Sequence, residues 1–76
     1  MAVPPPIVNT IRRLRFDRDE MTQEQLAKAI GMTRQTIVAI EAGKYAPSLE
    51  AAFRIARVFG IGVEDVFQWR ESPPPG

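Results

Sequence analysis

The 76-residue sequence contains no cysteine and no histidine. Without cysteine it has no disulfide framework, no thiolate nucleophile and no zinc–cysteine site, a composition that suits a reducing compartment. Without histidine it also lacks the usual general base and the commonest metal ligand of proteins. No nucleophile–base pair, glycine-rich phosphate loop or metal cluster stands out in the rest of the chain. We therefore expect no enzymatic activity, no metal and no small-molecule cofactor.

Long apolar runs and a strong charge of one sign are missing as well. Nowhere do about 18 apolar residues follow one another, and residues 1–8 lack the basic start of a secretion signal, so we expect a cytoplasmic protein without a membrane partner. Ten Lys and Arg against nine Asp and Glu give a formal net charge of +1. The most basic segment holds Arg12, Arg13, Arg15 and Arg18. Any attraction to nucleic acid should therefore be local.

Proline gathers near the two ends of the chain, in VPPP and SPPPG. Because proline disfavours regular helix, we predict a flexible arm over residues 1–6, one domain over residues 7–69 and a flexible tail over residues 70–76. A domain this short buries a smaller fraction of its surface than a larger one does. Association with a second copy could supply additional stability.

Residues 22–44, TQEQLAKAIGMTRQTIVAIEAGK, predict two short helices that meet at a glycine. Thr22 can cap the first helix with its hydroxyl, and Gln25 can reach back to complete a capping box. Gly31 suits the left-handed conformation in which helices often end, and Thr33 offers a second N-cap. The residues expected on the inner sides of these helices are Leu26, Ala29, Ile30, Ile37, Ile40 and Glu41.

Three further helices are predicted. The first has Ile7, Ile11 and Leu14 as its core stripe, is capped near its start by Asn9 or Thr10, and ends at about Arg18, while Phe16 and Met21 pack under the following loop. The next begins after Ser48 and ends at Gly60, and a short one, VEDVFQW, covers residues 63–69. The core residues expected between Ser48 and Gly60 are Leu49, Ala52, Phe53, Ala56 and Phe59, with Ile55 beside them.

Nine residues fall at a spacing that a known family shares: Gln23, Ala27, Gly31, Gln35, Ile37, Ile40, Glu41, Gly43 and Lys44. The chain resembles the Cro/repressor class of helix-turn-helix DNA-binding domains, the XRE family, over roughly residues 8–68. The resemblance implies an all-α, five-helix, lambda-repressor-like fold and a bacterial, archaeal or phage origin. It also implies an ion pair between Arg15 and Glu41.

In a helix-turn-helix domain, the second helix enters the major groove and its N-terminal residues reach base edges. Gln35 can pair bidentately with adenine and Arg34 with guanine, whereas aliphatic groups suit the methyl group of thymine. The residues expected to contact bases are Thr33, Arg34, Gln35, Val38 and Ala39. The residues expected to contact phosphates are Gln23, Thr36, Lys44 and Tyr45.

These features predict a sequence-specific transcriptional regulator that binds double-stranded DNA, most simply a repressor acting as a homodimer on a near-palindromic operator. One such helix reads few base pairs, and the small net charge adds little attraction, so two linked domains should bind much more tightly than one. The expected dimer interface consists of Val63, Val66, Phe67 and Trp69. Val66 and Phe67 could instead complete the core of the monomer. The alternative function is an antitoxin-like interaction module that also binds DNA.

Overall fold

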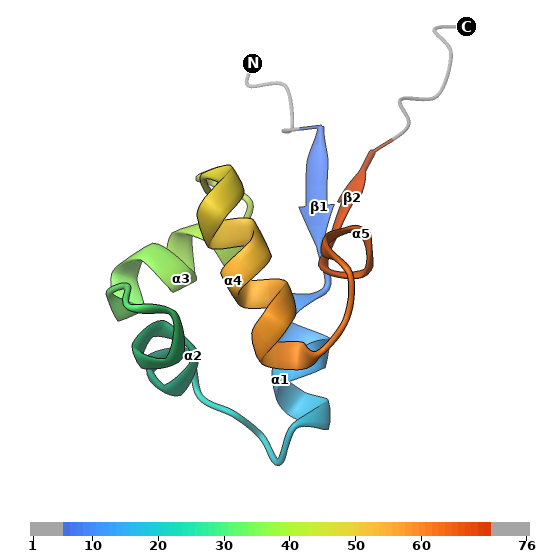
Figure 1. The fold of residues 1–76 in the computed structure, drawn as a ribbon. Coiled ribbons are helices and arrows are strands. Elements are labelled where there is room, and N and C mark those ends of the chain that lie inside the picture. The colour runs from blue at the N-terminus through green and yellow to red at the C-terminus, as the bar shows by residue number, and fades with distance from the viewer. Residues whose placement is uncertain (1–5, 71–76) are drawn as a thin grey trace, which may run out of the picture.

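The structure is a computed structural model and describes residues 6–70 of the chain. Within this range, five helices lie between two short strands in the sequence (Figure 1). The elements are β1 Ile7–Asn9, α1 Ile11–Asp17, α2 Gln23–Ile30, α3 Arg34–Glu41, α4 Leu49–Phe59, α5 Val63–Val66 and β2 Phe67–Trp69. The predicted five-helix, lambda-repressor-like class is confirmed, with a two-stranded sheet that we did not predict. The arm and the tail lie almost wholly outside the described residues, so those boundaries stay predictions.

The five helices enclose one hydrophobic core. Each of them contributes a side chain with no exposed surface: Ile11, Leu26, Ile37, Ile55 and Val66, in the order of the helices. Complete burial of an aliphatic side chain of this size is worth roughly 1.5–3 kcal/mol relative to exposure. The orientation of α2 and α3 is therefore fixed by side chains from every helix of the domain.

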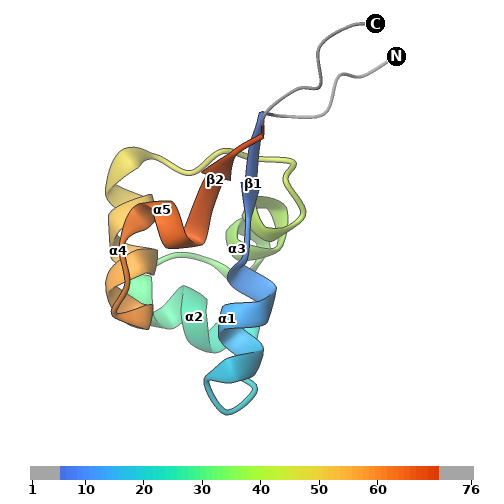
Figure 2. The same ribbon diagram turned by 90° about the vertical axis from the view of Figure 1, so that its right-hand side faces the viewer.

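The strands β1 and β2 correct our prediction at both ends of the domain. They pair antiparallel, with Ile7 opposite Trp69 and Asn9 opposite Phe67. The first helix begins at Ile11, directly after the predicted cap residues, so Ile7 lies in a strand and not in the helix, and the last helix ends at Val66, short of the predicted Trp69. β-branched and aromatic residues favour a strand when a partner is present, and here the partner comes from the other end of the chain. The pair of strands β1 and β2 is called the ribbon below. Figures 1 and 2 show it at the end of the molecule opposite the α1–α2 loop.

The start of α1 is joined to α5 and to the ribbon. The side-chain oxygen of Asn9 accepts a hydrogen bond from the Ile11 backbone N–H at 3.1 Å. Thr10 occupies the N-cap position, but its hydroxyl donates to the Asp65 carbonyl at 2.9 Å. The Thr10 backbone N–H donates to the Val66 carbonyl, also at 2.9 Å. Of the two residues predicted to cap this helix, Asn9 is therefore the one whose side chain does so.

Several predicted core residues are exposed. On α4, Phe53 is 53% exposed and Leu49 even more so, because the buried face of this helix is centred on Ile55. At about 100° per residue, two positions of displacement move a side chain to the opposite side of a helix. On α2, Ala27 is buried, whereas Ala29, which we expected in the core, is exposed.

Phe16 is also exposed, to 67%, and does not pack under the α1–α2 loop. In this loop, Asp19 and Glu20 both have positive φ, 53° and 55°, so the chain turns sharply after α1. Met21, by contrast, packs against the core as predicted.

Candidate nucleic-acid interface

The start of α2 is fixed by a reciprocal capping box. The Thr22 hydroxyl accepts a hydrogen bond from the Gln25 backbone N–H at 3.0 Å, and the Gln25 side chain accepts one from the Thr22 backbone N–H at 2.8 Å. At the other end of the helix, Gly31 has φ 73° and ψ 33°, the left-handed conformation that glycine adopts readily. The predicted cap and stop of α2 are both confirmed.

The start of α3 is capped by Thr33, whose hydroxyl accepts a hydrogen bond from the Thr36 backbone N–H at 3.2 Å. The two threonine hydroxyls are also hydrogen-bonded to each other at 2.9 Å. After α3, Gly43 has φ 76° and the Lys44 backbone N–H donates to the Ala39 carbonyl at 2.9 Å. This turn brings Lys44 back beside the C-terminal end of α3.

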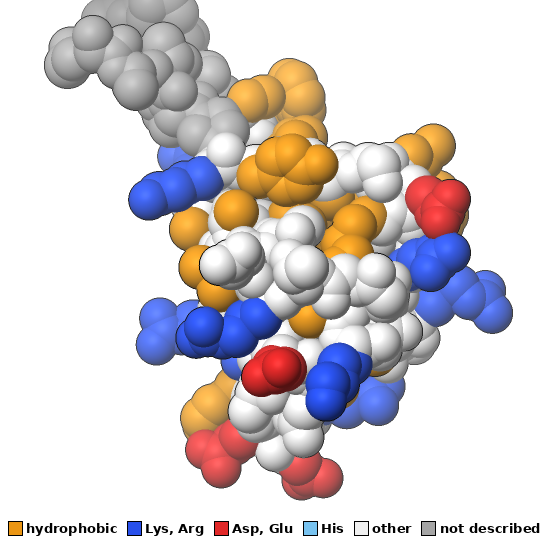
Figure 3. Space-filling model, turned by 90° about the vertical axis from the view of Figure 1, so that its left-hand side faces the viewer, with side chains coloured by type: hydrophobic (Ala, Val, Ile, Leu, Met, Phe, Trp, Pro, Cys, Tyr) orange, Lys and Arg blue, Asp and Glu red, His pale blue; other side chains and the backbone are white. Residues whose placement is uncertain are grey.

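One side of α3 faces solvent while the other lies in the core. Arg34, Gln35 and Val38 are exposed and Ala39 is partly exposed, whereas Ile37 and Ile40 are buried. On the side of the molecule that carries α2 and α3, Figure 3 shows Lys and Arg side chains on both flanks. The exposed residues combine a guanidinium, an amide and two small aliphatic groups. Such groups can hydrogen-bond base edges and contact thymine methyls.

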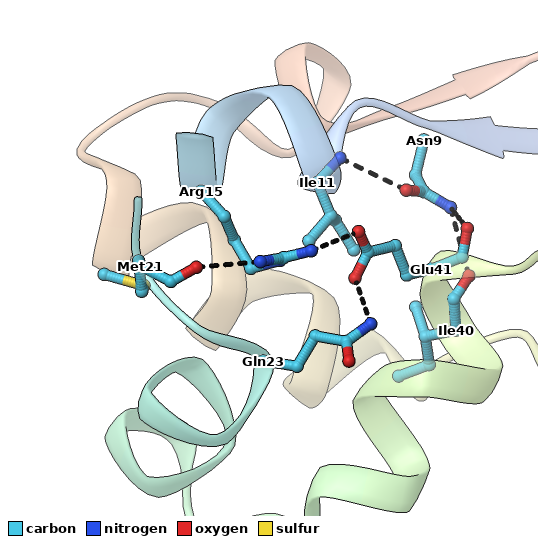
Figure 4. A network of polar contacts seen from close by, with 7 residues as sticks. All are labelled: Asn9, Ile11, Arg15, Met21, Gln23, Ile40 and Glu41. Carbon is cyan, nitrogen blue, oxygen red and sulfur yellow. Dashed lines mark hydrogen bonds and ion pairs between the residues drawn. The ribbon is translucent and has the colours of Figure 1, made fainter. Parts of the chain in front are cut away.

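A network of polar contacts holds α3 against α1 and α2 (Figure 4). Arg15 and Glu41, for which the family resemblance implies an ion pair, lie 2.7 Å apart, with side chains only 16% and 10% exposed. The same guanidinium donates to the Met21 carbonyl at 2.7 Å. The other oxygen of the Glu41 carboxylate accepts a hydrogen bond from the Gln23 amide at 2.9 Å. Glu41 thus joins three segments of the chain.

Asn9 extends this network to the ribbon. Its amide donates to the Ile40 carbonyl at 3.0 Å and to the Glu41 carbonyl at 3.4 Å, at the C-terminal end of α3. Sequence reasoning considered Asn9 only as a helix cap. The second role depends on a contact across more than thirty positions, which no local pattern in the sequence could indicate.

Gln23 was predicted to contact a phosphate, and the structure places it at the first turn of α2, half-buried. One of its two amide hydrogens is directed at Glu41. A glutamine amide carries two N–H donors and one carbonyl acceptor, so a second donor is left for another partner. The contact with Glu41 also restricts the rotamers of the side chain.

An open groove runs between α1 and the two helices α2 and α3, with a volume of about 1370 Å³. From α1 it is bordered by Arg12 and Arg13, and from the other side by Gln23, Arg34 and Val38. Two of the residues predicted to contact bases and one predicted to contact phosphate thus border a single depression. The groove also brings α1 arginines to the same surface.

The predicted dimer interface does not lie on one surface. Val66 has no exposed surface and belongs to the core, so its assignment to an interface was wrong. Val63 and Phe67 are half-buried and pack against the core. Trp69 is 65% exposed, and Ile7, its partner in the ribbon, is exposed as well. Of the predicted cluster, Trp69 therefore offers most surface to a partner.

Tyr45, which was predicted to contact a phosphate, lies in the loop between α3 and α4. It is exposed and borders a small apolar pocket of about 200 Å³, together with Ile7, Pro47 and Phe67. Tyr45 therefore lies next to the ribbon.

Residues 11–66 match the model of a family described as helix-turn-helix, and the chain belongs to that family. Over 52 residues it is 57% identical to an uncharacterized HTH-type transcriptional regulator of Methanocaldococcus jannaschii, an alignment that covers 68% of this chain and 79% of the relative. It is 46% identical over 64 residues to the uncharacterized HTH-type transcriptional regulator YgzD of Bacillus subtilis, covering 84% and 94%. The protein is accordingly a transcriptional regulator with a helix-turn-helix DNA-binding domain.

A third relative is the cryptic phage CTXphi transcriptional repressor RstR of Vibrio cholerae. The chain is 36% identical to it over 62 residues, which cover 82% of this chain and 55% of the repressor. Within residues 6–70, no helix has the length and apolar character needed to cross a membrane. In the same part of the chain, no three acidic, cysteine or histidine side chains gather into a possible metal site.

Proposed function

We propose that the protein is a repressor that binds a near-palindromic operator as a homodimer and places α3 in the major groove. The observation that carries this proposal is the exposed face of α3, where Arg34, Gln35 and Val38 project from a helix fixed by buried contacts on its other side. Repression is favoured over activation by the similarity to RstR, which is a transcriptional repressor. Such a regulator would act in the cytoplasm, where bacterial, archaeal and phage DNA is transcribed.

Base reading is assigned to the residues at the start and middle of α3. Gln35 would pair with an adenine and Arg34 with a guanine, each through two hydrogen bonds. Val38, Ala39 and the methyl group of Thr33 would contact thymine methyls. The hydroxyl of Thr33 is engaged as the N-cap, so its contribution is apolar.

Phosphate contacts are assigned to groups at the ends of α2 and α3. The ammonium of Lys44 supplies a charge beside the C-terminal end of α3, and Gln23 supplies an amide at the first turn of α2. The hydroxyls of Thr36 and Tyr45 are the remaining predicted donors. Such contacts fix the position of a protein on the duplex without reading its sequence.

Dimerisation is assigned to the ribbon, with Trp69 as the central residue, and Phe67 in the same strand and Val63 at the start of α5 contribute only the parts of their side chains that the core leaves exposed. Large aromatic side chains dominate the energy of many protein interfaces. A two-fold axis would let each copy cover the same apolar surface of the other. On an operator, the two α3 helices would then lie about 34–36 Å apart, one turn of DNA.

The test begins with selection of bound sequences from a random pool of duplexes. A palindromic consensus is expected, together with two chains per operator in sedimentation experiments. An enriched half-site bound by one chain would reject the homodimer. The absence of any enriched sequence would reject the specific repressor itself.

A further inference from the structure

We propose that Arg12, in the first turn of α1, binds a DNA phosphate that flanks the groove occupied by α3. This inference rests on the proposed function, because it assigns an additional contact to the same DNA complex. Arg12 was seen in the sequence only as part of a basic segment, and the family spacing gives it no role.

The position of Arg12 follows from the contacts of its neighbours. Asn9 connects the start of α1 to the last carbonyls of α3, and Arg15 reaches Glu41 in the same part of α3. Residues three apart lie on the same side of a helix, so Arg12 shares the α1 face of Arg15. It lies one turn nearer to the ribbon and borders the open groove together with Arg34.

The diameter of α3 brings the elements beside it close to the sugar–phosphate backbones. An α-helix with its side chains is about 10–12 Å across, comparable to the width of the major groove, which is about 12 Å. When the N-terminal residues of α3 reach base edges, side chains that flank the C-terminal end of the helix lie toward the phosphates at the edge of the groove. Lys44 and Arg12 both lie beside the C-terminal end.

The other arginines in α1 and directly after it form contacts within the protein. Arg15 is in the partly buried pair with Glu41, and Arg18 donates to the Val58 carbonyl on α4 at 3.1 Å. Arg13 lies 3.9 Å from Asp17 along the same helix. Among the described residues, Arg12 takes part in none of the ion pairs, and its side chain is exposed. Its charge is thus available to an external anion.

Acidic groups along the groove do not cancel this charge. The groove is bordered by Glu20, Glu24 and Glu41. Glu41 is already paired with Arg15, and Glu20 follows α1 in the loop at the far end of that helix from Arg12. Glu24 lies in the first turn of α2, where a carboxylate is favoured by the helix dipole. The positive end of the groove is the one at Arg12.

The experiment compares Arg12→Ala with Arg57→Ala, on the selected operator and on a random duplex, across a series of salt concentrations. Arg57 is an exposed arginine on α4 that does not border the groove, so both variants lose the same charge. For each bound chain, loss of one phosphate contact lowers the slope of log K against log salt by about 0.9. We expect this decrease for Arg12→Ala, equally on both duplexes, and an unchanged slope for Arg57→Ala.

Arg12→Lys provides a second variant that retains the charge and should retain the slope, and thermal unfolding of each variant verifies that it is folded. An unchanged slope in Arg12→Ala would overturn the inference, as would an equal decrease in Arg57→Ala. A larger loss on the operator than on random DNA would make Arg12 a base contact and would also overturn it. None of these results affects the proposed function, which is tested separately by the sequences that the original protein selects and by the number of chains bound per operator.

Discussion

The exposed side of α3 and the β1–β2 ribbon are both open to solvent, but they present different chemistry. The side of α3 presents a guanidinium and an amide in Arg34 and Gln35, together with small aliphatic groups. The ribbon presents Trp69 and Ile7, opposite each other in the pairing register. The first surface suits the edges of bases and the second suits an apolar protein surface.

If α3 binds DNA and the ribbon binds a second copy, as we propose, the two activities should be separable by mutation because they use different surfaces. They are joined through Asn9, which belongs to the ribbon and contacts the C-terminal end of α3. The ion pair of Arg15 and Glu41 continues that connection toward α2. Variants of this network should disturb both surfaces, whereas variants of either surface should leave the other unchanged.

Glu41→Ala should have the largest effect, because it removes the carboxylate that joins α1, α2 and α3. It leaves the guanidinium of Arg15 without its charged partner in a site that is only 16% exposed. Breaking a buried pair in this way lowers the free energy of unfolding by about 3–5 kcal/mol, less where water enters. Urea unfolding measures the effect. Glu50→Ala is the control, since its pair with Arg54 is well exposed and worth about 1 kcal/mol or less. Equal midpoints for the two variants would contradict this prediction.

Trp69→Ala should weaken self-association through the ribbon and leave the exposed side of α3 unchanged. The side chain is mostly exposed, so the monomer should stay folded while the dimer weakens by about 2 kcal/mol or more, roughly 30-fold in its dissociation constant. Analytical ultracentrifugation measures that constant. Phe53→Ala removes another exposed aromatic side chain, from α4, and should leave the dissociation constant unchanged. If the Trp69 variant associates as the original does, the ribbon is not the interface.

Gln35→Ala should change DNA binding by the exposed side of α3 and leave self-association unchanged. For each bound chain it should weaken binding to the selected operator by about 1–3 kcal/mol and relax the preference at one base pair of the half-site, because one bidentate contact is lost. Arg34→Ala should do the same at a different base pair. Binding titrations with the operator and with single-base variants test both. A loss of the same size on random DNA would show that the altered residue does not read a base.

Lys44→Ala should have the smallest effect and the least dependence on sequence. A phosphate contact adds to affinity for every duplex, so operator and random DNA should be weakened alike, and the salt slope should fall by about one unit for each bound chain. Titrations at several salt concentrations give the slope. A slope that stays the same would remove Lys44 from the phosphate contacts.

The parts of the fold that could be predicted are those whose signals are local. The capping box of Thr22 and Gln25, the N-cap of Thr33 and the left-handed Gly31 each depend on residues within four positions. The ion pair of Arg15 and Glu41 followed only from the resemblance to a family, since the two residues are far apart in the sequence.

The parts that could not be predicted depend on distant contacts or on a choice between two faces. Residues 67–69 form a strand because residues 7–9 lie beside them, and a helical spacing of apolar residues gave no sign of that. On α4, Phe53 and Ile55 are both suited to a core, and packing against the other helices decides which one is buried. Val66 likewise fitted either an interface or the core.

The ribbon pairs the first described residues with the last, and the Arg70 backbone N–H donates to the Pro6 carbonyl. A two-stranded sheet of three residues per strand has little stability of its own. Closing so long a loop carries an entropic penalty that grows with its length, by about 0.6 kcal/mol for each doubling, and the helices must offset it first. We therefore expect strand pairing to be a late event in folding. Hydrogen exchange at the ribbon amides should report whether every helix between the two ends is in place.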